Sequence, residues 1–203
     1  MEFYNFAKGI VSGLYHLFFR IRVEGLENMP KSGAFVVCAN HQSNLDPPML
    51  GVCLPLRLRY MAKEELFHNK LFGKLIRTLG AFPIKRGKSD IGALRASVKM
   101  LQEGEPVAVF PEGGRSHQGY LRKGKQGAAL IAAKAGVNIL PVGICGSYKP
   151  FHRIIVRIGE VISMEPYFER KLESGELQEI TDNKIMPAIA ALAGVKTYEN
   201  RNS

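Results

Sequence analysis

Residues 34–48 have the sequence AFVVCANHQSNLDPP, in which an apolar run is followed directly by polar residues. The first six residues are continuously apolar over the length of a strand, which is typical of a parallel strand covered on both faces. Asn, Ser and Pro are frequent in the remainder and favour turns. We therefore expect a buried strand over residues 34–39 that ends in a polar turn.

Apolar runs of strand length recur along the chain and alternate with helical patterns. Further strands are expected at residues 59–62, 107–110, 139–144 and 154–158. Helices are expected at residues 69–79, 91–103, 125–135 and 181–193, the last interrupted by Pro187. Alternation of this kind favours an α/β fold, and we expect a single domain with a mostly parallel central sheet flanked by helices.

Length and composition narrow the class of protein. With 203 residues, 46% of them hydrophobic, the chain can bury the core of one domain and is unlike a disordered sequence. Cys38, Cys53 and Cys145 lie in apolar stretches without a Cys-x-x-Cys pair, so we expect buried thiols of a reducing compartment and neither disulfides nor a zinc site. The net charge of +10 favours an anionic partner: nucleic acid, anionic lipid or a phosphorylated substrate.

The N-terminal segment predicts an amphipathic helix over residues 2–23. Bulky apolar residues recur there at steps of three and four, at Phe3, Phe6, Ile10, Leu14, Phe18 and Ile21. Only 11 residues separate Lys8 from Arg20, or roughly 16 Å of helix against a hydrocarbon core of about 30 Å, so the helix cannot span a bilayer. No cleavage signature is present. The helix either docks on the protein's own core or lies in a membrane interface, with Lys8, Arg20 and Arg22 at the headgroups.

The polar turn after residue 39 places a histidine and an aspartate five positions apart. On one helix His41 and Asp46 would point about 140° apart, and on one strand they would lie on opposite faces, so they meet only across a turn. There the Asp46 carboxylate can accept from one His41 nitrogen while the other faces a substrate, as in hydrolases and transferases. The alternative is structural: Asp46 caps a helix with Pro47 at its first position, and His41 is a loop residue.

A second polar turn follows the expected strand at residues 107–110. Residues 110–116 are FPEGGRS. The two glycines let a ligand approach the backbone closely, and an arginine just beyond them can donate two hydrogen bonds to a phosphate. The turn therefore predicts an anion-binding loop or, alternatively, a tight turn in which Glu112 pairs with Arg115.

Two further patterns indicate no function by themselves. Residues 82–88 are FPIKRGK, a basic run that indicates electrostatic attraction at most. Residues 139–144 are ILPVGI, a core strand with an internal proline.

Taken together in chain order, these four blocks resemble the glycerolipid acyltransferase family, whose best-known members are bacterial 1-acyl-glycerol-3-phosphate acyltransferases. The family's blocks are Asn-His with a His-x4-Asp spacing, an arginine two residues after Phe or Ile, Phe-Pro-Glu-Gly-x-Arg-Ser, and a hydrophobic-Pro-hydrophobic run. Arg86 matches the second block and Pro141 the fourth, while position x, often threonine, is Gly114 here. The resemblance spans about residues 34–146.

The resemblance implies transfer of a fatty acyl group from a thioester to the free hydroxyl of lysophosphatidate, which gives phosphatidic acid in phospholipid biosynthesis. His41 takes the role of general base, for which an imidazole pKa of about 6.5 is suitable, and Asp46 sets its tautomer. The remaining implied roles are phosphate binding by Lys85, Arg86 and Arg115, and substrate positioning by Glu112 and Gly113.

The resemblance also implies an acyl-CoA or acyl-carrier-protein thioester as co-substrate, no metal or other cofactor, and peripheral or monotopic association with the cytoplasmic face of the cell membrane. Residues 1–23 are then a membrane-associating helix and residues 24–203 the acyltransferase domain. The alternatives are the same chemistry on another lysophospholipid or acylated acceptor, a hydrolase that uses the same histidine and aspartate, and a non-enzymatic basic protein that binds lipid. No nucleic-acid-binding motif appears, so no nucleic acid partner is expected.

Overall fold

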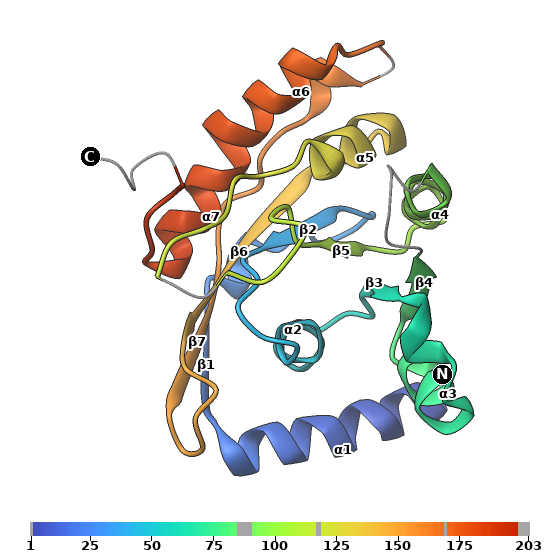
Figure 1. The fold of residues 1–203 in the computed structure, drawn as a ribbon, viewed down its shortest axis with the longest axis vertical. Coiled ribbons are helices and arrows are strands. Elements are labelled where there is room, and N and C mark those ends of the chain that lie inside the picture. Colours follow the sequence, from blue (N-terminus) through green and yellow to red (C-terminus); the bar gives the residue numbers. More distant parts are fainter. Residues whose placement is uncertain (1, 85–90, 117–118, 169, 199–203) are drawn as a thin grey trace.

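A computed structural model of the chain describes residues 2–84, 91–116, 119–168 and 170–198 (Figure 1). One sheet of seven strands has the order β1-β7-β6-β2-β5-β3-β4. The strands are β1 (Arg20–Glu24), β2 (Val36–Ala39), β3 (Arg59–Lys63), β4 (Ala81–Ile84), β5 (Val107–Val109), β6 (Ile139–Gly146) and β7 (Arg153–Ile158). Only the pairing of β6 with β7 is antiparallel among these strands. The expected α/β domain with a mostly parallel sheet is confirmed.

Helices cover both faces of the sheet, as Figure 1 shows. The α-helices are α1 (Glu2–Phe18), α2 (Asp46–Cys53), α3 (Lys70–Thr78), α4 (Ile91–Gln102), α5 (Gly127–Ala135), α6 (Ser174–Ile180) and α7 (Met186–Ala193). Val36 and Cys38 of β2 belong to the core cluster shared with α4 to α7, whereas Val37 and Ala39 belong to the cluster shared with α1 and α2. Successive strand residues point to opposite faces, so the unbroken apolar run reflects burial of β2 on both sides.

The N-terminal helix ends at Phe18, and the expectation of a helix to residue 23 was wrong. Residues 20–24 alternate charged and apolar side chains, a period of two that suits a half-buried strand, and they pair with β7 as the edge strand β1. Ile21 is in phase with the helical repeat, which is why the pattern extended the helix too far. The segment that we propose as a membrane-associating helix therefore comprises α1 alone.

One side of α1 docks on α2 and the other remains exposed. On the inner side, the Tyr15 hydroxyl donates to the Leu45 carbonyl at 3.0 Å, and the Lys8 ammonium donates to the Leu54 carbonyl at 2.9 Å. Lys8 is thus bonded to the end of α2, not placed for lipid headgroups as the sequence analysis expected. The exposed side carries the large apolar residues Phe3, Phe6, Ile10, Leu14, Leu17 and Phe18. Within the described residues, no helix has the length and apolar character to cross a membrane.

Candidate active site

The chemistry-bearing turns meet at the carboxyl edge of the sheet. His41 follows β2, Glu112 follows β5 and Tyr148 follows β6, and β2 lies between β5 and β6. All three strands run parallel, so their carboxyl ends lie together, which is where open α/β sheets bind ligands. The Asn40 side chain joins the turn after β2 to strand β6, because its amide group donates to the Ile144 carbonyl and accepts from the Ile144 N–H.

His41 and Asp46 meet across the turn, the one arrangement in which their spacing allows contact. The distance between His41 Nδ1 and Asp46 Oδ2 is 2.8 Å, and the imidazole stacks on the Phe110 ring with 4.3 Å between centroids. Asp46 is also the first residue of α2, with Pro47 and Pro48 in the first turn. The pairing of His41 with Asp46 is therefore present, whereas the expectation that Asp46 caps the helix was wrong. Leu45 is the N-cap residue of α2, and no side chain caps this end of the helix.

The Asp46 carboxylate is fully buried and held by four donors. Its Oδ2 atom accepts from the backbone N–H groups of Gln42 and Ser43, each at 2.7 Å, as well as from the His41 ring. Because Oδ2 acts as an acceptor, Nδ1 of His41 carries the proton. The lone pair of the neutral ring then lies on Nε2, the nitrogen available to a substrate hydroxyl.

Tyr148 is the fourth donor and was not found from the sequence. Its hydroxyl donates to Asp46 Oδ1 at 2.8 Å, and its ring packs edge-on against Phe19. Burial, together with the charge of Asp46, raises the pKa of Tyr148 far above its ordinary value, so the hydroxyl stays protonated and remains a donor. No local pattern marks this residue, since 102 positions separate it from Asp46.

Replacing Tyr148 with Phe is expected to lower kcat by about tenfold with little change in either KM, because a hydrogen bond to a charged group is lost while the ring is kept. The carboxylate loses one of its four donors and orients the His41 ring less firmly. Steady-state kinetics with each substrate varied in turn checks this, and a variant with full kcat would contradict the role.

Glu112 anchors the second turn to the first. Its two carboxylate oxygens accept from the backbone N–H groups of His41 (2.7 Å) and Arg122 (2.9 Å), and the Ser116 N–H donates to the His41 carbonyl at 2.8 Å. Burial raises the pKa of Glu112, and the two backbone N–H groups oppose this. The alternative of a Glu112–Arg115 ion pair was wrong, because no such pair forms among the described residues. Both carboxylate oxygens of Glu112 accept hydrogen bonds from backbone N–H groups instead.

Basic side chains gather at the glycines of this turn. Gly113 has a φ of 64°, and a Cβ built there would lie 2.8 Å from Lys125 Nζ; one built on Gly114 would lie 2.6 Å from Arg122 Nη1. A larger residue at Gly114 would therefore displace the Arg122 guanidinium. Arg115 is exposed beside them. Arg122 and Lys125 were missed, because their proximity depends on how the chain returns to the turn.

Not every expected site residue can be placed. Lys85 and Arg86 lie outside the described residues, directly after β4 in the sequence. In the part of the chain that the structure describes, no group of three or more His, Cys, Asp or Glu side chains is arranged to hold a metal ion.

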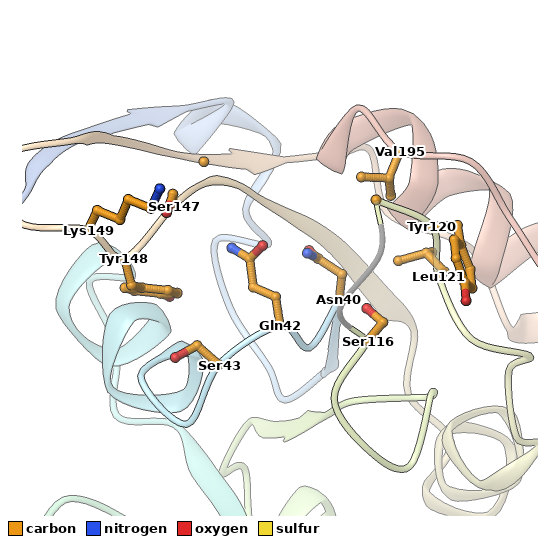
Figure 2. A pocket seen from close by; sticks show the side chains of 12 residues that line it. Asn40, Gln42, Ser43, Ser116, Tyr120, Leu121, Ser147, Tyr148, Lys149 and Val195 are labelled. Carbon is orange, nitrogen blue, oxygen red and sulfur yellow. The ribbon is translucent and has the colours of Figure 1, made fainter.

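A hollow of about 430 Å³ lies beside the turn that carries His41 and Asp46, although neither of these two residues lines it (Figure 2). Its lining comes from the segments after β2, β5 and β6, with Val195 after α7, and includes Gln42, Ser116 and Tyr148. The Nε2 atom of Gln42 is buried without a hydrogen-bond partner among the described residues.

A histidine oriented by a buried carboxylate at the carboxyl edge of an α/β sheet is an arrangement by which hydrolases and transferases deprotonate a nucleophile. The sequence profile of the Acyltransferase family matches residues 20–145. The chain belongs to this acyltransferase family.

Individual proteins agree with this assignment. The 1-acyl-sn-glycerol-3-phosphate acyltransferase of Bacillus subtilis is 33% identical over 144 residues, which cover 70% of this chain and 71% of that protein. The chloroplastic enzyme LPAT1 of Arabidopsis thaliana is 36% identical over 73% of this chain, although the match spans only 42% of its own length. The crystal structure of the 1-acyl-sn-glycerophosphate acyltransferase of Thermotoga maritima superposes with a TM-score of 0.72 at 27% identity, covering 93% of this chain and 79% of that one.

Proposed function

We propose that this protein transfers a fatty acyl group from a thioester donor to the free hydroxyl of 1-acyl-glycerol-3-phosphate, giving phosphatidic acid for phospholipid biosynthesis. The observation that carries the proposal is the 2.8 Å contact between His41 Nδ1 and Asp46 Oδ2 in a chain of the acyltransferase family. The names of its relatives in Bacillus subtilis and Arabidopsis thaliana support the acceptor.

The proposed reaction needs one base. His41 Nε2 takes the proton of the acceptor hydroxyl as its oxygen attacks the thioester carbonyl carbon, and Asp46 stabilises the imidazolium that forms. The tetrahedral intermediate collapses with cleavage of the carbon–sulfur bond, and the thiolate receives the proton from His41. A thiol pKa of about 8–9 makes this leaving group good enough that no covalent acyl-enzyme is required. The donor is acyl-CoA or an acyl-carrier-protein thioester.

The acceptor phosphate is held by cations around the glycine turn and the basic run after β4. Arg115, Lys85 and Arg86 are the residues proposed from the sequence, with Glu112 and Gly113 shaping the turn. The positions of Arg122 and Lys125 against Gly114 and Gly113 support an anion site at this turn.

Arg115→Ala is expected to raise the acceptor KM by roughly tenfold or more, because a charged hydrogen bond contributes about 1.5–3 kcal/mol, while the donor KM stays near its original value. Arg95→Ala, an exposed arginine of α4, is the matched control and should change neither constant. An increase confined to the donor KM would assign Arg115 to coenzyme A or carrier protein instead.

The decisive test of the function is an assay of purified protein with labelled acyl-CoA or acyl carrier protein and a panel of lysolipids. Transfer to lysophosphatidate above other acceptors supports the proposal. Preference for a different lysophospholipid or acylated acceptor would keep the chemistry and change the substrate. Release of free fatty acid would make the protein a hydrolase, and lipid binding without turnover would make it a non-enzymatic binder.

The enzyme acts at the cytoplasmic face of the cell membrane as a peripheral or monotopic protein, with α1 in the lipid interface. Support comes from the exposed apolar side of α1, where Phe6 and Leu17 are each 65% exposed. Side chains of this size at regular helical spacing suit the boundary between headgroups and acyl chains.

The double substitution Phe6→Gln with Leu17→Gln is expected to weaken vesicle binding by at least about tenfold, since each buried CH₂ contributes about 0.8 kcal/mol. Sedimentation with phospholipid vesicles measures this. Deleting residues 1–23 is a poorer test, because it also removes β1 from the sheet. Equal sedimentation of the variant and the original protein, or no sedimentation of the original, would show that α1 is only a docked helix.

A further inference from the structure

Helix α3 exposes an apolar face that the proposed chemistry does not use. Leu71 is 83% exposed, Phe72 46% and Leu75 39%. At 100° per residue these three side chains fall within one sector of the helix, whereas Lys70, Lys74 and Arg77 fall on a separate sector. Such a helix has the composition of one that lies at a lipid surface.

The protein holds α3 so that this face points outward. The Asn69 side chain caps the helix by accepting from the N–H groups of Leu71 and Phe72. Gly73 is buried, and a Cβ there would lie 2.9 Å from the Phe67 carbonyl oxygen, so the helix backbone packs closely on the preceding turn. Leu71 and Leu75 lie on the side of the helix opposite Gly73. Their exposure is therefore a result of how the helix is anchored.

The charge of α3 favours an anionic surface. The helix has three basic residues and no acidic one, although Glu64 and Glu65 are exposed in the turn before it. The Arg77 guanidinium lies over the Phe67 ring, 4.5 Å from its centroid, and Lys70 and Lys74 are exposed. With a net charge of +10 for the whole chain, approach to anionic phospholipid is favourable. A second copy of this chain would bring like charges together.

Helix α3 lies beside the N-terminal end of α1, as Figure 1 shows, and the two helices are in contact. Through Tyr15, α1 is also bonded to the loop that precedes Asp46. A surface that includes both helices is thus connected, through α1 and the Tyr15–Leu45 hydrogen bond, to the turn that carries His41 and Asp46.

We propose that α3 is a second membrane-contacting helix, which together with α1 binds the protein to an anionic phospholipid bilayer in one orientation. The proposal rests on the proposed function in one respect, that the acceptor is a membrane lipid. A single helix lets the protein rock about the helix axis while its apolar side stays in lipid. Two helices in contact fix the side of the protein that faces the bilayer.

The apolar contribution is tested by Leu71→Gln, with Ile91→Gln as the matched control on α4. Ile91 is 59% exposed but belongs to the opposite face of the sheet, and glutamine retains helix propensity in both variants. Leu71→Gln is expected to weaken binding to vesicles of phosphatidylcholine and phosphatidylglycerol by about tenfold. Ile91→Gln should bind like the original protein.

The charge contribution is tested by Lys70→Gln with Lys74→Gln, against Lys134→Gln with Lys171→Gln as a control of equal net charge. The α3 pair is expected to lose about fivefold per lysine on anionic vesicles at low salt and almost nothing on pure phosphatidylcholine. The control pair lies on exposed positions of other segments and should lose much less.

Three results would overturn the proposal: full vesicle binding by Leu71→Gln, equal losses in the α3 and control variants, or a stable dimer of the original protein that Leu71→Gln dissociates in light scattering. Failure of the proposed function is recognised separately. Acyl transfer to a soluble short-chain lysophosphatidate does not require a bilayer, so Leu71→Gln should retain that activity. If the original protein lacks this activity, the proposed function fails, but the vesicle measurements still test whether α3 binds the membrane.

Discussion

His41→Ala is expected to lower turnover by about 10² to 10⁴-fold, the range that general base catalysis contributes. The substitution leaves the fold intact because the structural hydrogen bonds of His41 belong to its backbone. Its N–H donates to Glu112, and its carbonyl accepts from the Ser116 N–H. Asp46 keeps its three other donors. The variant therefore removes the base without disturbing the turn.

The measurement is single-turnover acyl transfer with saturating lysophosphatidate, accompanied by circular dichroism and a thermal melt. His152→Ala, which alters an exposed histidine near the β6–β7 connection, is the control and should retain full activity. A folded His41→Ala protein with more than about a tenth of the original turnover would show that another group accepts the proton, since loss of a base costs at least about 10²-fold.

The parts of the fold that the sequence predicted well are those with a strong local pattern, either a continuous apolar run or a helical period. The apolar run of β2 and the helix α4 were both expected close to their observed bounds. The strand β4 was not expected, because Pro83 interrupts its short apolar run; as the outer strand of the sheet, β4 tolerates a proline. Near Pro187 the chain forms a π-helical turn (Thr181–Ile185) before α7. The α-helix expected over residues 181–193 is therefore interrupted, but before Pro187 and not at it.

The residues of the site also divide into those that the sequence predicted and those that it did not. His41, Asp46 and Glu112 follow predicted strands in the sequence, and adjacent strands of a parallel sheet bring such turns together. Three other contacts in the site depend on tertiary packing, and no local pattern in the sequence predicts them. They are those of Tyr148 with Asp46, of Phe110 with His41, and of Lys125 with Gly113. Cys53 and Cys145 were expected to be buried and are only partly so, whereas Cys38 is fully buried; all three are free thiols.

Asp46→Asn is expected to lower kcat by about 10²-fold or more while the protein remains folded, because the neutral amide keeps the hydrogen bonds but not the charge. The amide oxygen can replace Oδ2 and accept from the Gln42 and Ser43 N–H groups and from His41. The amide NH₂ then faces Tyr148, whose hydroxyl can rotate and accept. The imidazolium formed during acyl transfer loses its negative partner.

Asp46→Ala separates this electrostatic role from the structural one. It leaves two backbone N–H groups and the Tyr148 hydroxyl without their buried acceptor, at a cost of roughly 3 kcal/mol or more in the free energy of unfolding, since each unsatisfied buried donor costs about 1–3 kcal/mol. Denaturant unfolding of both variants should therefore show a large loss for Ala and a small one for Asn, with both nearly inactive. An Asn variant that is stable and retains more than a tenth of the activity would mean that Asp46 serves only to begin α2 and hold the turn.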